Sequence, residues 1–270
     1  MMQYDPIKRS LGRIFNQTPF LRKLFYRLLD LLLLRSCHNR RELRELDKSG
    51  FDPEHIADAG SGFGQYVYYL SGKYPEARIT GLDIKQEQVD DCKQFFNAIG
   101  RNQKVEFQYA DLTRLENHEE WDLVLSVDVM EHIEDDRTVF QRIHKGLKPG
   151  GILLISTPSD QGGSDVHHED DESFIEEHVR DGYGVEEIDG KLREAGFGDI
   201  QIKYSYGVPG KISWKLSMKY PIILANVSKV FLLLLPFYYL ITYPLCYLLN
   251  LADVRRVHPS GTGLIVKCRK

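Results

Sequence analysis

The stretch His55-Ile56-Ala57-Asp58-Ala59-Gly60-Ser61-Gly62-Phe63-Gly64 decides the fold of this 270-residue chain. A short apolar run ends at an acidic residue, and three glycines follow at a spacing of two. About twenty residues later a second apolar run, Ile79-Thr80-Gly81-Leu82-Asp83, ends in another acid. This order of residues is typical of an α/β protein that binds a nucleotide-type ligand at the end of its first strand.

The residue types in this stretch suit a ligand with a ribose and a cationic group. Asp58 can accept hydrogen bonds from a cationic or amino group, and Asp83 can accept them from two ribose hydroxyls. Gln65 stands where a dinucleotide-binding turn requires Gly or Ala, so a dehydrogenase is disfavoured. A plain glycine-rich turn would explain the spacing alone. The strand before it, a helix over 66–74 and the position of Asp83 favour the binding site. Three residues can adopt positive φ and let a ligand approach the backbone: Gly60, Gly62 and Gly64.

Further motifs follow in a consistent order. They are Val105–Leu112, Trp121–Asp128, Leu147–Ser156, and Glu194–Phe197 before Ile200–Ile202. As a set, over residues 51–207 and 260–270, they resemble the class I S-adenosylmethionine-dependent methyltransferases. The resemblance implies a Rossmann-like doubly wound sheet of seven strands, the last antiparallel, with helices on both faces and an apolar helical insertion between strands six and seven.

The domain organisation that we expect follows from this resemblance and from composition. Basic amphipathic helices occupy 1–50, the methyltransferase core 51–207, the apolar insertion 208–259 and the final core strand 260–270. The insertion is expected either to associate with a membrane or to form a lid.

The resemblance also assigns the cofactor site to S-adenosylmethionine. Asp83 is expected to bind the ribose, Asp111 to lie near the adenine amine, and Asp128 near the methionyl end. The full set of predicted cofactor-binding residues is Asp58, Gly60, Gly62, Gly64, Asp83, Ile84, Asp111, Leu112 and Asp128.

Candidate catalytic residues follow strand four, at the carboxyl edge where such sheets bind their ligands. His132 can act as a general base near neutral pH, with Glu131 beside it, although a purely structural role for His132 remains open. His167 is a second candidate base, in a loop after strand five that also reads as a solvated acidic loop. The segment His178–Gly184 resembles one that closes over the site in relatives.

Asp128, Glu131 and His132 also resemble the E-x-x-E-H metal-binding pattern of ubiquinone-biosynthesis O-methyltransferases. Asp128 replaces the first glutamate, and its shorter side chain puts metal binding in doubt. We therefore predict a site without a metal ion.

Charge and cysteine content restrict the remaining functions. The formal charge is +6 over residues 1–48 and +9 over 203–270, against −8 over 49–159 and −11 over 160–202. The basic ends lie beside apolar residues, which disfavours nucleic-acid binding and favours a membrane surface. The four cysteines form no CxxC motif, and the first residues lack a signal-peptide layout, so a reducing compartment is expected.

The N-terminal segment Pro19–Arg35 is expected to form one amphipathic helix, with Thr18 as N-cap. Six apolar residues share its wide face, and four charged residues lie opposite: Leu21, Leu24, Phe25, Leu28, Leu31 and Leu32, against Arg22, Lys23, Arg27 and Asp30. The apolar face is expected either to pack on the core or to lie in a membrane interface.

Residues 230–251 contain no charge and are long enough to span a bilayer. A single crossing would separate the final strand from its sheet. Pro236 and Pro244 are also expected to break the run into short helices. An interfacial or re-entrant cap is therefore predicted, and a buried dimerisation or lid subdomain is the alternative.

Together these patterns predict a methyltransferase acting on a lipophilic acceptor, such as a quinone precursor, a phenol or another lipid. The enzyme is expected on the cytoplasmic face of a membrane. The alternatives are a soluble small-molecule O- or N-methyltransferase with a hydrophobic lid, and a non-catalytic cofactor-binding membrane adaptor of a biosynthetic complex. The acceptor atom and the oligomeric state are not predicted.

Overall fold

The computed structural model describes residues 18–162, 179–227 and 231–270. It contains two compact units. The core unit comprises Leu46–Asp160, Glu177–Ile202 and Leu264–Lys270. The helical unit comprises Met1–Glu45, Gln161–Glu176 and Lys203–Gly263.

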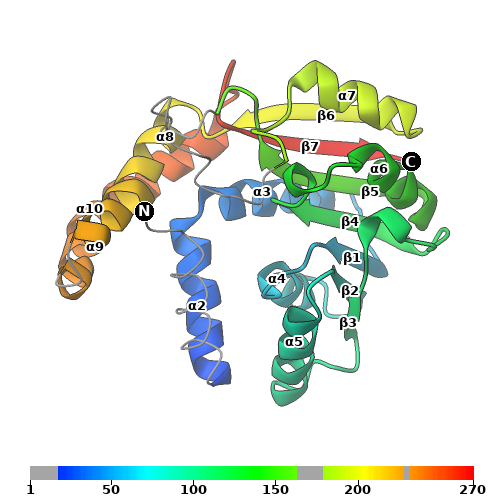
Figure 1. Ribbon diagram of the computed structural model, residues 1–270, viewed down its shortest axis with the longest axis horizontal. Helices are drawn as coiled ribbons and strands as arrows, with labels where there is room; N and C mark the ends of the chain where they lie inside the picture. Colours follow the sequence, from blue (N-terminus) through cyan, green and yellow to red (C-terminus); the bar gives the residue numbers. More distant parts are fainter. Residues whose placement is uncertain (1–17, 163–178, 228–230) are drawn as a thin grey trace. The chain divides into compact units, whose positions relative to one another are not determined.

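A seven-stranded sheet has the order β3-β2-β1-β4-β5-β7-β6 (Figure 1). Its strands are β1 (His55–Ala59), β2 (Arg78–Asp83), β3 (Val105–Tyr109), β4 (Trp121–Val127), β5 (Leu147–Pro158), β6 (Gly198–Ser205) and β7 (Gly263–Arg269). Neighbours from β3 to β5 run parallel. Lys270 N donates to Gly151 O at 3.0 Å, so the end of β7 meets the start of β5 and β7 is antiparallel. The predicted fold class is confirmed.

The core unit packs helices against strands whose central residues are apolar and buried in β4 and β5. The helices are α4 (Gln65–Lys73), α5 (Gln86–Ala98), α6 (Asp136–Gly146) and α7 (Val185–Glu194), with the 3₁₀ turns η1 (Leu112–Arg114) and η2 (Met130–His132). Leu123–Leu125 of β4 and Ile152–Ile155 of β5 are fully buried, as expected of parallel strands covered on both faces. α5 buries Val89, Cys92, Phe95 and Phe96. The strand order reverses between β1 and β4, which places the expected ligand site at the carboxyl ends of these strands.

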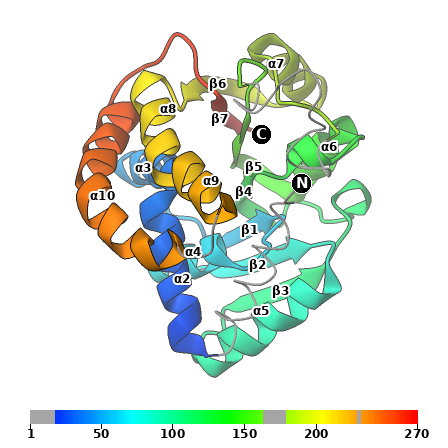
Figure 2. The same ribbon diagram turned by 60° about the vertical axis from the view of Figure 1, so that its left-hand side comes forward.

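The helical unit contains α2 (Pro19–Leu32) and most of α3 (Leu34–Lys48). Between β6 and β7 it adds α8 (Val208–Trp214), the π-helix η3 (Lys215–Lys219), α9 (Tyr220–Val227) and α10 (Phe231–Arg255). α8 and α10 lie side by side (Figure 2). Within the described parts of the chain, one helical stretch, Leu233–Arg255, is long and apolar enough to cross a membrane.

The first helix differs from its prediction in two respects. Thr18 caps it and Pro19 opens it as expected, but it ends at Leu32, because Leu33 is extended and separates it from α3. Its buried residues are Arg22 and Tyr26, not the leucines. The arginine is accommodated because its Nε donates to the Tyr26 hydroxyl at 2.8 Å. The large apolar side chains Phe20, Leu24, Leu28 and Leu31 are exposed.

The predicted break of the apolar run at its prolines is wrong. Pro236 and Pro244 both lie inside the continuous helix α10. Each proline removes one backbone donor and crowds the carbonyl four residues earlier. Both are exposed, whereas hydrogen bonds on the opposite side of the helix, from Tyr238 and Tyr239, hold the turns between them to η3. Packing thus overrides the local effect of the prolines.

Candidate cofactor and catalytic site

The glycine turn after β1 is hydrogen-bonded to the end of β2. Gly60 N and Ser61 N both donate to the carbonyl of Leu82, at 2.8 and 2.9 Å. Gly60 has a φ of +82°, and a Cβ at this position would lie 2.3 Å from Cγ2 of Val129. The turn therefore passes so close to the loop after β4 that only glycine fits.

The carboxylate of Asp83 is held by two backbone amides. Gly62 N donates to its Oδ2 at 2.7 Å, and Lys85 N donates to its Oδ1 at 2.8 Å. Each carboxylate oxygen retains a further lone pair, so the group can still accept from two hydroxyls. A Cβ on Gly62 would meet only the Gln88 side chain, at 3.7 Å. The turn is therefore open beside this carboxylate.

Asp58 is fully buried at the end of β1. Burial, and then the charge of Asp83, raise its pKa to about 8. Its Oδ2 receives no hydrogen bond from any residue that the structure describes. A buried carboxylate oxygen without a donor is costly, and a cationic or N–H-bearing ligand would supply the missing partner. The residues present therefore fit a positively charged ligand at this end of the site.

The other predicted cofactor residues lie at the ends of neighbouring strands. Asp111 follows β3 and caps η1, where its Oδ1 accepts from the amide and hydroxyl of Thr113 at 3.0 and 2.7 Å. The hydroxyl bond lowers the pKa of Asp111. Leu112 is buried and Ile84 is exposed. Asp128 follows β4 with a φ of +53°, and its amide donates to Ser156 O at 2.8 Å. Because β1 to β4 are parallel, all these residues share one sheet edge.

The predicted catalytic residues lie on η2, directly after Asp128. Glu131 is buried, and its carboxylate accepts from the Thr157 hydroxyl at 3.1 Å. His132 is half-buried, and its amide donates to Val129 O. His167 lies outside the described residues. Among the residues that the structure does describe, no three His, Cys, Asp or Glu side chains are grouped to hold a metal ion.

Residues 56–151, which contain this geometry, match the family described as "Methyltransferase domain". They form a class I S-adenosylmethionine-dependent methyltransferase domain. The predicted family is confirmed, and S-adenosylmethionine is the cofactor that this family uses. The narrower likeness to ubiquinone-biosynthesis enzymes stays a prediction.

Curated relatives match part of this chain. "Phosphoethanolamine N-methyltransferase 1" of Triticum aestivum is 32% identical over 148 residues, which are 54% of this chain and 29% of the relative. "Malonyl-[acyl-carrier protein] O-methyltransferase 2" of Ilyobacter polytropus is 28% identical over 103 residues, 38% of this chain and 39% of the relative. The chain thus spans less than a third of the wheat enzyme and well under half of the bacterial one.

Solved structures show the same fold. A putative sarcosine dimethylglycine methyltransferase from Galdieria sulphuraria has a TM-score of 0.56 at 18% identity, over 84% of this chain and 82% of its own. Phosphoethanolamine N-methyltransferase 2 of Haemonchus contortus, solved in complex with S-adenosyl-L-methionine, has a TM-score of 0.57 at 19% identity, over 80% of this chain and 48% of its own. At these identities the likeness establishes the fold alone.

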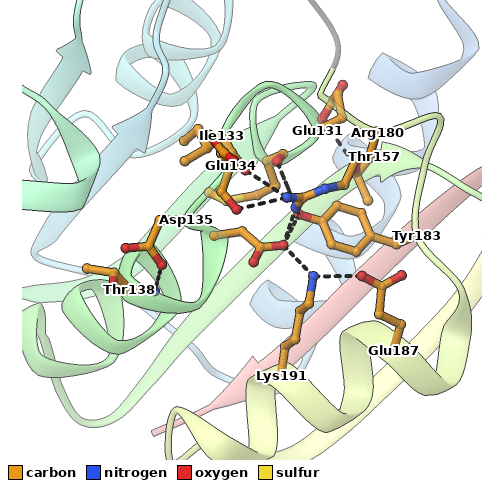
Figure 3. A network of polar contacts seen from close by, with 12 residues as sticks. Glu131, Ile133, Glu134, Asp135, Thr138, Thr157, Arg180, Tyr183, Glu187 and Lys191 are labelled. Carbon is orange, nitrogen blue, oxygen red and sulfur yellow. Dashed lines mark hydrogen bonds and ion pairs between the residues drawn. The ribbon is translucent and has the colours of Figure 1, made fainter.

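A buried ionic network beside the loop of the predicted catalytic residues was not predicted (Figure 3). Asp136, at the start of α6, is paired with Arg180 and with Lys191, whose Nζ lies 2.8 Å from its Oδ2. The Tyr183 hydroxyl donates to the same oxygen at 2.6 Å. Burial, and then this bond to Asp136, raise the pKa of Tyr183.

The network fixes the loop that carries His132. The Arg180 guanidinium donates to the carbonyls of Ile133 and Glu134 at 2.9 and 3.1 Å. The Tyr183 hydroxyl reaches Met130 O at 3.1 Å, and Val179 N donates to Glu131 O at 3.1 Å. The segment after residue 178 therefore supports η2 from both ends. The only sequence signal for it was the resemblance of His178–Gly184 to a closing segment.

Proposed function

We propose that this protein transfers a methyl group from S-adenosylmethionine to a lipophilic small molecule at a membrane surface. The observation that carries the cofactor assignment is the unpaired, buried Oδ2 of Asp58 beside the glycine turn and Asp83. A cationic group next to an anionic carboxylate satisfies that oxygen, and the two lone pairs left on Asp83 suit a ribose diol.

The roles of the site residues follow from their positions. When bound, S-adenosylmethionine supplies an electrophilic methyl group on a sulfonium. Asp83 accepts from the ribose hydroxyls, Asp111 from the adenine amine, and Asp58 faces the cationic methionyl end. His132, on a loop supported by Arg180 and Tyr183, takes the proton from a hydroxyl acceptor. Glu131 is a positioning residue, because its buried carboxylate ties η2 to Thr157 of β5.

The lipophilic acceptor is supported by the helical unit. Its helices expose large apolar side chains, and the segment 203–270 has ten Lys and Arg residues against one acidic residue. An apolar acceptor partitions into a bilayer, where an enzyme at the surface meets it at high local concentration. The four cysteines are free thiols, which suits the cytoplasmic face.

Two other functions are compatible with parts of the chain. The names of the plant and worm relatives point to a small, charged amine acceptor such as phosphoethanolamine. A non-catalytic adaptor would bind the cofactor without turnover. The exposed apolar side chains favour the lipid acceptor over the small, charged amine, and turnover separates a lipid methyltransferase from an adaptor.

Transfer of radiolabel from S-adenosylmethionine tests the three functions side by side. The purified protein is incubated with a total lipid extract, with phosphoethanolamine, or with buffer. The organic phase is counted, and so are the aqueous products after they are separated from S-adenosylmethionine. We expect label in the organic phase, reduced at least tenfold by His132→Asn but unchanged by His118→Asn, an exposed control. Label on phosphoethanolamine alone would refute the lipid acceptor. Tight cofactor binding with no turnover on either acceptor would identify an adaptor.

A further inference from the structure

Helix α10 is apolar on its outward side, and its inward side buries the polar residues Asn250 and Asp253 together with Cys246 and Val254. Its outward residues recur at helical spacing and are strongly exposed, with Leu233 at 76%, Leu240 at 76% and Ile241 at 78%. Its inward residues Asn250 and Asp253 are 4% and 0% exposed. A helix on the surface of a globular protein in water shows the reverse arrangement.

Polar contacts fix the rotation of α10 about its own axis. The hydroxyls of Tyr238 and Tyr239 donate to the carbonyls of Leu216 and Ser217 in η3, at 2.6 and 2.7 Å. At the other end of the helix, Asp253 accepts from Gly210 N at 2.9 Å and is paired with His38 at 2.8 Å. Turning the apolar side inward would leave these buried groups without partners. The outward leucines therefore remain exposed to whatever surrounds the helix.

Helix α2 of the same unit repeats the arrangement. Arg22 and Tyr26 are buried at 3% and 1% exposure, while Phe20 is 74% exposed and Leu31 is 47% exposed. Two helices from opposite ends of the sequence thus present apolar residues outward. Removing such side chains from water is favourable in proportion to the apolar area covered, so a partner that covers several of them binds favourably.

Charge decides which partner fits. Asp253 is the one acidic residue between 206 and 262, and it is buried, whereas this segment carries six Lys and Arg residues. Residues 1–48 also have an excess of six positive charges. Two copies that apposed such surfaces would repel each other, whereas anionic headgroups attract exposed cations.

We infer that the outward faces of α10 and α2 form a docking surface for an anionic phospholipid bilayer. This rests on the proposed action on a membrane-borne acceptor and names the partner that brings the enzyme to it. The chain does not cross the bilayer once, because β6 and β7, on either side of the insertion, are neighbours in one sheet. The preceding helices carry Lys211, Lys215 and Lys219 at every fourth position, which makes them poor partners in a second crossing. The helices therefore lie in the interface or re-enter from one side.

Vesicle flotation tests this surface in the full-length protein. Vesicles of phosphatidylcholine with phosphatidylglycerol are compared with vesicles of phosphatidylcholine alone. The polar double variant L240Q/I241Q is compared with the apolar control L240I/I241L. We expect the control to float like the parent and L240Q/I241Q to bind at least tenfold more weakly, with vesicles of phosphatidylcholine alone capturing less of either protein. Circular dichroism and S-adenosylmethionine affinity verify that both variants are folded.

Two results would overturn the docking surface. One is equal flotation of L240Q/I241Q and the control. The other is a parent protein that does not float and that sediments as a dimer, while the L240Q/I241Q variant sediments as a monomer. The apolar face would then be a contact between two copies of the chain. A parent that floats as expected yet labels nothing in the lipid extract contradicts only the proposed function, so the two failures are distinguishable.

Discussion

The ammonium of Lys191 lies 2.8 Å from the carboxylate of Asp136, and both side chains are buried. Arg180 shares the same carboxylate, and Glu187 accepts from Lys191 at 2.6 Å. One carboxylate therefore balances two cations that the chain brings from 44 and 55 residues away. The position of the loop bearing His132 depends on these ion pairs, because Arg180 also donates hydrogen bonds to carbonyls of that loop.

Replacing Asp136 with asparagine should destabilise the fold by about 3–5 kcal/mol, because it removes the carboxylate paired with Arg180 and leaves Lys191 with Glu187 alone. Asp135→Asn is the matched control: Asp135 caps α6 through Thr138 N and is exposed, and asparagine caps equally well. Urea unfolding measures the stability of both variants. Similar midpoints for the two variants would mean that the network contributes little.

The two glycines of the turn should respond differently to alanine. Gly60→Ala places a Cβ 2.3 Å from Val129, so it should cost several kcal/mol of stability. Gly62→Ala makes only an ordinary contact with Gln88 and should cost about 1–2 kcal/mol through its positive φ. Thermal unfolding of both variants tests whether Gly60→Ala is the more destabilised of the two. Adding Val129→Ala should restore part of the stability that Gly60→Ala removes. It should restore none of the stability that Gly62→Ala removes.

The parts of the structure that sequence could predict are those set by local pattern. Strand ends, the glycine turn and Asp83 are separated by few residues, and their spacing alone requires them to meet at one sheet edge. The start of α2 was predictable for the same reason, because Thr18 and Pro19 act within one turn.

The parts that could not be predicted depend on distant partners. Arg22 belongs to a charged face by periodicity, but it is buried beside Tyr26. Pro236 and Pro244 are local helix breakers, but contacts to η3 hold α10 together. From its local sequence, Asp136 is an acidic residue in the first turn of a helix, where it favours the helix start. No neighbouring residue indicates that it pairs with Lys191.

Asp83→Asn should weaken S-adenosylmethionine binding about 10- to 100-fold, since hydrogen bonds to a charged acceptor contribute about 1.5–3 kcal/mol. Asparagine also offers an N–H group to one of the backbone amides that the carboxylate now accepts from. Isothermal titration calorimetry measures the affinity. Asp90→Asn, exposed on α5, is the control and should bind as the parent does. Unchanged affinity in Asp83→Asn would remove the ribose assignment.

The raised pKa of Asp58 predicts a pH-dependent stability. The folded protein keeps this proton up to about pH 8, whereas an unfolded chain loses it near pH 4. The contribution of Asp58 is therefore fully present below about pH 4 and is lost as the pH rises to about 8, at up to about 1.4 kcal/mol per pH unit. Asp58→Asn should be the more stable protein at pH 8 without ligand. Urea unfolding at several pH values tests the difference.

The same pKa predicts that cofactor binding releases a proton. A cationic ligand beside Asp58 favours its ionised form, so binding at pH 7 should expel the proton that burial and the charge of Asp83 retain. Affinity should then increase from pH 6 to pH 8, and calorimetry in buffers of different ionisation enthalpy should report the released proton. Asp58→Asn should abolish both effects. Binding of the parent without proton release would show that the methionyl end lies away from Asp58, even if the ribose is bound by Asp83.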